Sequence, residues 1–230
     1  MYKIAVIGPE STGKSALTKA LARHYSSPYV DEYARDYVAK LNRPYTFEDL
    51  CEIAKVQIEA ETFFQSLSDS AVGVPFPACL HPTVFFPDYF VPDQENQLSP
   101  VTMSPAILHR DQLRESPFVF FDTELIITKV WFEYCYQRVP ENVIRQLGQG
   151  FFDLYLLCDT DLPWIPDPVR EHGNDREYFS AWYRREAEQL GKQYVIVQGS
   201  GNKRLTNSVE AINNWLGTAK LKITQTSVNR

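Results

Sequence analysis

The segment GPESTGKS, residues 8–15, constrains the fold of this chain more than any other feature of its sequence. Glycines at positions 8 and 13, followed by Lys14 and Ser15, match the pattern of a phosphate-binding loop. The apolar run KIAVI precedes the segment and an amphipathic stretch follows it, which is the strand and helix context that the pattern requires. An ordinary glycine-containing turn is the alternative, and it does not account for both flanks. The segment therefore predicts a strand, a tight loop and a helix at the start of an α/β domain.

The residues of this loop predict a site for a nucleoside triphosphate and a magnesium ion. In such loops the backbone N–H groups point at a phosphate chain, and the helix N-terminus adds partial positive charge. Lys14 is expected to reach the β- and γ-phosphates, and the Ser15 hydroxyl is expected to bind Mg²⁺. We therefore expect ATP and Mg²⁺ as cofactors, bound by the loop residues Gly8, Glu10, Ser11, Thr12, Gly13, Lys14 and Ser15. The next residue, Ala16, is excluded from this set.

Four further apolar runs predict the rest of a sheet. After the first strand at 2–8 they are a short piece ending near residue 31, FVFFD at 118–122, DLYLLCD at 153–159 and QYVIVQG at 193–199. Stretches with helical spacing of apolar residues separate them, and such alternation favours a parallel sheet covered by helices. We expect a three-layer α/β fold of the P-loop NTPase class with a mostly parallel five-stranded sheet. Ligands in such sheets bind beyond the carboxyl ends of the strands.

The distribution of prolines divides the chain. Eight of its fifteen prolines fall between residues 70 and 117, and proline removes the backbone donors that regular structure needs. We expect one domain over residues 1–217, interrupted by a proline-rich insertion at about 70–117 through which regular structure cannot run. Gly217 is expected to stop the last helix, leaving residues 218–230 as a loose tail.

Composition excludes several classes of protein. A net charge of −6 gives no electrostatic reason to expect nucleic acid as a partner, and no apolar run is long enough to span a membrane. The four cysteines lack a C-x-x-C pair, so neither a zinc site nor a disulfide framework is expected. We expect a cytoplasmic protein with a small-molecule partner, and a homo-oligomer remains open.

Carboxylates follow two of the predicted strands. Asp122 ends an apolar strand, as the magnesium-binding carboxylate of P-loop proteins does, and capping the next helix is its alternative role. Glu124 is predicted either to contact substrate or metal or merely to favour the helix dipole. Asp31 and Glu32 end the second strand, where a carboxylate can accept the proton of an attacking hydroxyl, unless both are solvated loop acids.

The segment DLPWIPDPVREHGNDREYF at 161–179 concentrates cationic and aromatic residues after the fourth strand. Trp164, Arg170 and Arg176 lie in it. Arginines on a mobile segment at this place could close over the phosphates, and an ordinary surface loop with ion pairs at a helix end is the alternative.

Four motifs in the same order resemble a known family. GPESTGKS, VDEYARDYV, FFDTELIITKVW and the 153–179 segment are similar to the ribosylnicotinamide kinase domain of the bacterial NAD-biosynthesis regulator NadR and to related stand-alone proteins. The resemblance covers roughly residues 1–65 and 118–199, and the proline-rich insertion departs from it. It implies a nucleoside-kinase-like P-loop fold that uses ATP and Mg²⁺ to phosphorylate the 5′-hydroxyl of nicotinamide riboside.

The same resemblance assigns roles to residues of this chain. It implies catalytic roles for Glu32 and Arg170. It implies substrate-binding roles for Arg35 and Trp164. Asp122 and Glu124 match the first and last positions of the family's D-T-[DE] motif. The preference for Glu32 over Asp31 as the base rests on this resemblance. Two rival functions remain open from the sequence: a P-loop ATPase or GTPase that acts as a regulatory switch, and a nucleotide sensor without turnover.

Overall fold

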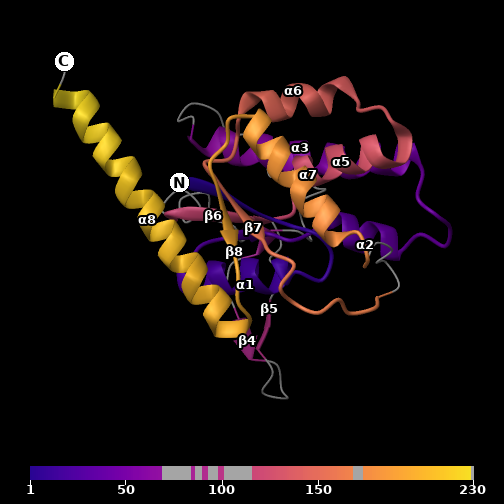
Figure 1. Cartoon of the computed structure of the whole chain (residues 1–230), viewed down its shortest axis with the longest axis horizontal. Helices are drawn as coiled ribbons and strands as arrows, with labels where there is room; N and C mark the ends of the chain where they lie inside the picture. The colour runs from indigo at the N-terminus through magenta and orange to yellow at the C-terminus, as the bar shows by residue number, and fades with distance from the viewer. Residues whose placement is uncertain (69–83, 86–89, 93–97, 101–115, 168–172, 229–230) are drawn as a thin grey trace.

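The computed structural model describes residues 1–68, 84–85, 90–92, 98–100, 116–167 and 173–228 (Figure 1). Its strands are β1 (Tyr2–Ile7), β2 (Tyr29–Val30), β3 (Val84–Phe85), β4 (Phe90–Pro92), β5 (Leu98–Pro100), β6 (Phe118–Asp122), β7 (Leu154–Cys158) and β8 (Tyr194–Val197). Its helices are α1 (Lys14–His24), α2 (Tyr33–Ala39), α3 (Phe47–Ser68), α5 (Leu125–Tyr136), α6 (Glu141–Gln149), α7 (Arg176–Gln189) and α8 (Gly201–Val228).

The main sheet has the strand order β3-β2-β6-β1-β7-β8. The pairings β2–β6, β6–β1, β1–β7 and β7–β8 are all parallel, which confirms the five predicted strands and their parallel arrangement. Val6 lies opposite Asp122 in the register of β1 and β6. The phosphate loop and the carboxylate of Asp122 therefore leave the same edge of the sheet from neighbouring strands.

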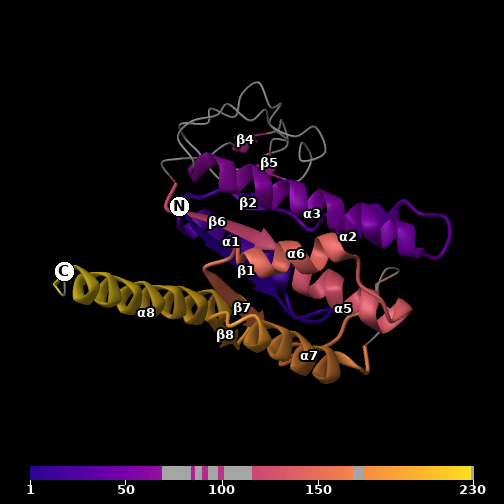
Figure 2. The same ribbon diagram turned by 90° about the horizontal axis from the view of Figure 1, so that it is seen from above.

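The sheet is buried on both faces. In β1, Ala5 and Ile7 belong to one apolar cluster and Ile4 and Val6 to the other, as expected for a strand between two helical layers. The first cluster also takes side chains from α3, α5, α6 and α7, and the second takes them from α1 and α8. Figure 2 shows α3 and α8 on opposite sides of the strands. The three predicted layers are confirmed.

The proline-rich insertion contains more regular structure than expected. β3 pairs with β2 and adds a short antiparallel edge to the main sheet, while β4 and β5 pair with each other. The expectation that regular structure cannot run through residues 70–117 is wrong for these three pieces, because strands of two or three residues fit between prolines and at edges. The rest of the insertion lies outside the described residues.

The last helix is longer than the sequence predicted. α8 continues through Gly217 to Val228, so the expected stop of the helix at that glycine is wrong, while a loose tail from residue 218 stays a prediction. A glycine inside a helix costs only about 1 kcal/mol relative to alanine, and no proline follows it to break the helix. Figures 1 and 2 show the end of α8 extending away from the sheet.

Within the described residues, no helix is long and apolar enough to cross a membrane. The described cysteines Cys51, Cys135 and Cys158 form no disulfide with one another.

A buried carboxyl group lies between α3 and α6. Glu61 is 3% exposed and accepts a hydrogen bond from Nε2 of Gln146 at 2.8 Å. Burial raises the pKa of Glu61 to about 8, against the opposing effects of Gln146 and Lys192. The folded protein therefore keeps this carboxyl group protonated at neutral pH.

Substitution Glu61→Gln should make stability less sensitive to alkaline pH. An unfolded glutamate releases its proton near its ordinary pKa of 4.5, whereas folded Glu61 keeps it to about 8, so stability declines as pH rises between these values. Glutamine has no proton to lose, and its amide oxygen can still accept from Gln146. Denaturation midpoints between pH 5 and 9 should fall less steeply for Glu61→Gln than for wild type or for the exposed control Glu48→Gln. Equal slopes in all three proteins would contradict the assignment.

Candidate active site

The loop between β1 and α1 is built around two glycines. Gly8 has a φ of 146°, and a Cβ there would lie 2.8 Å from the carbonyl oxygen of Cys158. Gly13 is left-handed with a φ of 76° and forms the N-cap of α1. The hydroxyl of Thr12 donates to the carbonyl of Pro9 at 2.7 Å and closes the loop from inside. The backbone thus needs glycine at both positions that the phosphate-loop pattern specifies.

A buried arginine that the sequence did not reveal anchors this loop from α8. Arg204 is 3% exposed; its Nη1 donates to the carbonyl of Thr12 at 2.8 Å, and its Nε donates to the carbonyl of Gly199 at 2.6 Å. Its Nη2 forms an ion pair with Asp161, which also accepts from the N–H of Gly199 at 2.6 Å. One guanidinium group therefore joins the loops that follow β1, β7 and β8.

Substitution Arg204→Met should destabilise the protein by about 2–4 kcal/mol. Removing one partner of a fully buried ion pair costs about 3–5 kcal/mol, and Asp161 retains 31% exposure, which lowers the cost. The urea midpoint should fall accordingly, whereas Lys203→Met, an exposed neighbour on the same helix, should change stability by less than about 0.5 kcal/mol. A midpoint for Arg204→Met equal to that of Lys203→Met would contradict the anchoring role.

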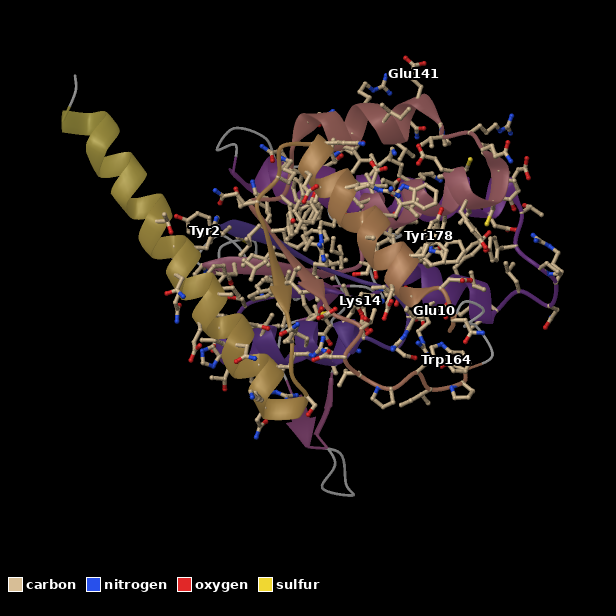
Figure 3. The ribbon with its side chains drawn as sticks, viewed as in Figure 1. Tyr2, Glu10, Lys14, Glu141, Trp164 and Tyr178 are labelled. Carbon is tan, nitrogen blue, oxygen red and sulfur yellow. The ribbon has the colours of Figure 1, made fainter. Side chains whose placement is uncertain are left out.

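Lys14 and Ser15 occupy the first turn of α1, where the phosphate-loop pattern places them. The Nζ atom of Lys14 donates to the carbonyl of Pro9 at 3.0 Å, so its charge stays inside the loop. Both residues line a cavity of about 530 Å³ that opens at the carboxyl edge of the sheet. Figure 3 shows Lys14 beside Glu10, another residue of the cavity wall. Ala16 lines the cavity as well, so its exclusion from the binding residues stays a prediction.

Asp122 is a buried carboxylate at the end of β6. It is 2% exposed, and neither oxygen has a hydrogen-bond partner among the described residues. Burial raises the pKa of Asp122, and the charge of Glu32 raises it further. Lys14 and the nearby Ser15 hydroxyl lower this pKa. The Ser15 hydroxyl lies near the carboxylate without the geometry of a hydrogen bond. Unpartnered carboxylate oxygens beside Ser15 fit a Mg²⁺ ion, which binds proteins through one or two carboxylates and otherwise through water and substrate phosphates. No cluster of three acidic, His or Cys ligands accompanies them in the described part of the chain.

Glu124, and not Asp122, caps α5. The Oε1 atom of Glu124 accepts from the N–H of Ile126 at 2.9 Å, so the capping role considered for Asp122 belongs to the residue two positions later. Glu124 is 1% exposed, burial raises its pKa, and it does not line the large cavity. The structure thus shows a helix-end role for Oε1, whereas Oε2 has no partner among the described residues. Glu124 also lines a small cavity together with Asp31, Asp122 and Thr123, so its contact with substrate or metal stays a prediction.

The two acids that follow β2 have different surroundings. Asp31 forms an ion pair with Lys19 of α1 at 3.0 Å, a cation that the sequence reading did not single out. The side chain of Glu32 has no hydrogen bond or ion pair with a described residue, and both acids line the large cavity. Glu32 is therefore the less engaged of the two carboxylates.

The loop after β7 contacts the phosphate loop at one point and α2 at another. The hydroxyl of Ser11 donates to the carbonyl of Ile165 at 3.3 Å and accepts from its N–H at 3.2 Å. At the other end Arg35 forms an ion pair with Asp167. Figure 3 shows the same loop, marked by Trp164, passing near Glu10.

The predicted roles of this loop in binding phosphate and substrate stay predictions, and the contacts that its residues make within the protein are as follows. Arg176 donates from Nη2 to the carbonyls of Thr160 and Leu162 at 2.9 and 2.8 Å, so it holds the loop, and its buried Nη1 lacks a partner among the described residues. Trp164 does not line the cavity; a Cβ at Gly173 would lie 2.7 Å from its ring. Arg170 lies outside the described residues.

The far end of the cavity is apolar and aromatic. Its wall includes Trp131 and Tyr183, and the Trp131 ring stacks on Phe179 with centroids 5.3 Å apart. Sequence reasoning missed both wall residues, because their positions on α5 and α7 look like ordinary core positions of helices. Val38, Tyr45, Leu50, Ile53 and Ile127 complete this end.

Comparison with known proteins identifies the family. The family described as AAA domain matches residues 3–72 and 102–204, more than half of the chain. This chain belongs to the AAA domain family. The match omits residues 73–101, which lie within the predicted insertion.

Individual relatives of this AAA domain protein share its fold at low identity. The trifunctional NAD biosynthesis/regulator protein NadR of Escherichia coli (strain K12) is 22% identical over 217 residues, which are 93% of this chain and 42% of that protein. Crystal structures of NadR protein in complex with NR, and with NAD and AMP-PNP, match with TM-scores of 0.54 and 0.53 at 20% identity. The two matches cover 94% and 93% of this chain, and this chain spans about half the length of each NadR chain. The predicted P-loop fold class is confirmed.

Proposed function

We propose that this protein is an ATP-dependent nucleoside kinase that phosphorylates the 5′-hydroxyl of nicotinamide riboside, giving nicotinamide mononucleotide. The observation that carries the proposal is one cavity with two chemically different ends. A phosphate loop with Lys14 forms one end, and unpaired Glu32 with an aromatic wall forms the other. A kinase needs both ends, because it must hold a phosphoryl donor and an acceptor in contact.

The residues of the first end are suited to stabilise a transferring phosphoryl group. Lys14 supplies a positive charge, and the loop N–H groups and the N-terminus of α1 supply partial charges where negative charge develops. Ser15 and Asp122 would hold Mg²⁺. When bound, that ion would neutralise charge on the phosphates.

The residues of the second end are suited to a nucleoside. Glu32 can accept the proton of the attacking hydroxyl, which phosphoryl transfer requires of a positioned carboxylate. Trp131 is half-buried and lines the cavity, so its ring can face a base, and an electron-rich ring attracts the cationic ring of nicotinamide riboside. The structure of NadR protein in complex with NR supports this acceptor.

The runner-up function is a P-loop ATPase or GTPase that acts as a switch without a small acceptor. It accounts for the phosphate loop, but it gives no role to the acid and aromatic end of the cavity. A cytoplasmic location and a nucleoside partner remain predictions of the kinase reading.

A panel of nucleosides separates the two functions. ADP release is measured with ATP and Mg²⁺ alone and after addition of nicotinamide riboside, adenosine, cytidine, uridine or thymidine. The kinase predicts release that depends on an acceptor and is greatest with nicotinamide riboside. A constant rate across the panel would favour the switch.

A further inference from the structure

Thr123 adopts a backbone conformation that threonine rarely takes. It links β6 to α5 with a φ of 72°, while its N–H donates to the carbonyl of Val6 at 3.1 Å. A β-branched residue is disfavoured at positive φ, whereas glycine adopts it without steric cost. The tight connection explains the conformation but does not explain why a threonine stands there.

The hydroxyl of Thr123 is buried without a partner. The residue is 6% exposed, and its Oγ1 has no hydrogen bond within the described residues. Three other buried threonines differ, because the hydroxyls of Thr12, Thr18 and Thr128 each donate to a protein oxygen at 2.7, 3.0 and 2.7 Å. An unsatisfied buried hydroxyl destabilises a protein, and backbone strain of this kind gathers at functional sites.

The position of Thr123 points to the acceptor. It lines the large cavity and also a small adjoining cavity of about 20 Å³, and Asp31 lines both as well. Since β2 pairs with β6, with Val30 opposite Phe121, the turn at Thr123 lies beside the end of β2 that carries Asp31 and Glu32. Thr123 therefore belongs to the wall that the two acids share.

We infer that the hydroxyl of Thr123 hydrogen-bonds a ribose hydroxyl of the nucleoside and helps the site select ribonucleosides. This inference rests on the proposed kinase function. A ribose hydroxyl both donates and accepts, so it can satisfy the orphaned Oγ1 without a charge. A site built to bond a substrate hydroxyl discriminates against analogues that lack it.

The test compares Thr123→Val, Thr123→Ser and the control Thr128→Val with wild type. Each is assayed with nicotinamide riboside and with its 2′-deoxy and 3′-deoxy forms. Thr123→Val should lower kcat/KM for nicotinamide riboside roughly tenfold, the effect of one lost hydrogen bond, without changing the KM for ATP. With the deoxy form that lacks the bonded hydroxyl, the kcat/KM of Thr123→Val should equal that of wild type. Thr123→Ser should stay close to wild type on all three.

Thermal denaturation provides a second readout. Thr123→Val should melt no lower than wild type, because the hydroxyl it removes is unsatisfied in the free protein. Thr128→Val should melt lower, because it breaks a bond to Gln57, and it should keep wild-type discrimination between ribose and deoxyribose.

Three results would overturn the inference. They are wild-type kinetics for Thr123→Val, an equal loss on all three nucleosides, and a change confined to the response to Mg²⁺ or ATP. Absence of turnover by the wild-type protein would overturn the proposed function and this inference together. Turnover by wild type with an unaffected variant would overturn the inference alone.

Discussion

Lys14→Ala should lower phosphoryl transfer by at least about 10²–10³-fold and leave the protein folded. The expected loss follows from removing a charge positioned where negative charge develops during transfer. The fold should survive, because the one bond of the Lys14 side chain described here is to the carbonyl of Pro9 in its own loop. Such a bond contributes about 1 kcal/mol.

The measurement is the initial rate of ADP release at saturating ATP and nicotinamide riboside, with thermal denaturation of the same samples. Lys55→Ala serves as the control, since Lys55 is an exposed residue of α3 far from the phosphate loop in sequence. A folded Lys14→Ala protein with turnover similar to that of Lys55→Ala would remove the basis of the P-loop assignment.

Glu32→Gln should lower kcat by about 10²–10⁴-fold with the KM for ATP almost unchanged. Glutamine keeps the shape of the side chain and loses the basicity that accepts the proton of the attacking hydroxyl. The loss should be large but incomplete, because positioning and charge stabilisation supply most of the catalysis of phosphoryl transfer. Asp122→Asn should instead weaken the response to Mg²⁺.

Rates across Mg²⁺ and nucleoside concentrations distinguish these variants, with Glu48→Gln as an exposed control on α3. If Glu32→Gln keeps the wild-type kcat and only raises the KM for the nucleoside, Glu32 binds ribose and is not the base. Asp31 or Glu124 would then be the next candidate, and only Oε1 of Glu124 is engaged in capping α5.

Local features of the fold could be predicted from the sequence. The apolar run 118–122 became β6 with the same bounds, and the phosphate loop lies where its glycines indicated. Both depend on interactions within a few residues along the chain. The residue that caps α5 was harder to predict. The left-handed turn at Thr123 decides whether the side chain of Asp122 or that of Glu124 reaches the first turn of this helix.

Long-range features of the site could not be predicted. Arg204 contacts the phosphate loop across 192 positions, and its sequence neighbourhood is that of a surface helix. Lys19, Trp131 and Tyr183 reach the cavity only because α1, α5 and α7 pack against the sheet as they do. The bonds from Arg176 to the carbonyls of Thr160 and Leu162 could not be predicted for the same reason, and its role toward phosphate stays a prediction.

The measurement that tests the central claim most directly is the identity of the phosphorylated product. Wild-type protein is incubated with ATP, Mg²⁺ and nicotinamide riboside, and the products are followed by phosphorus NMR and mass spectrometry. The account predicts one 5′-phosphorylated nucleoside formed for each ADP released, with none formed by Lys14→Ala. Release of ADP with inorganic phosphate and no phosphorylated nucleoside would contradict it.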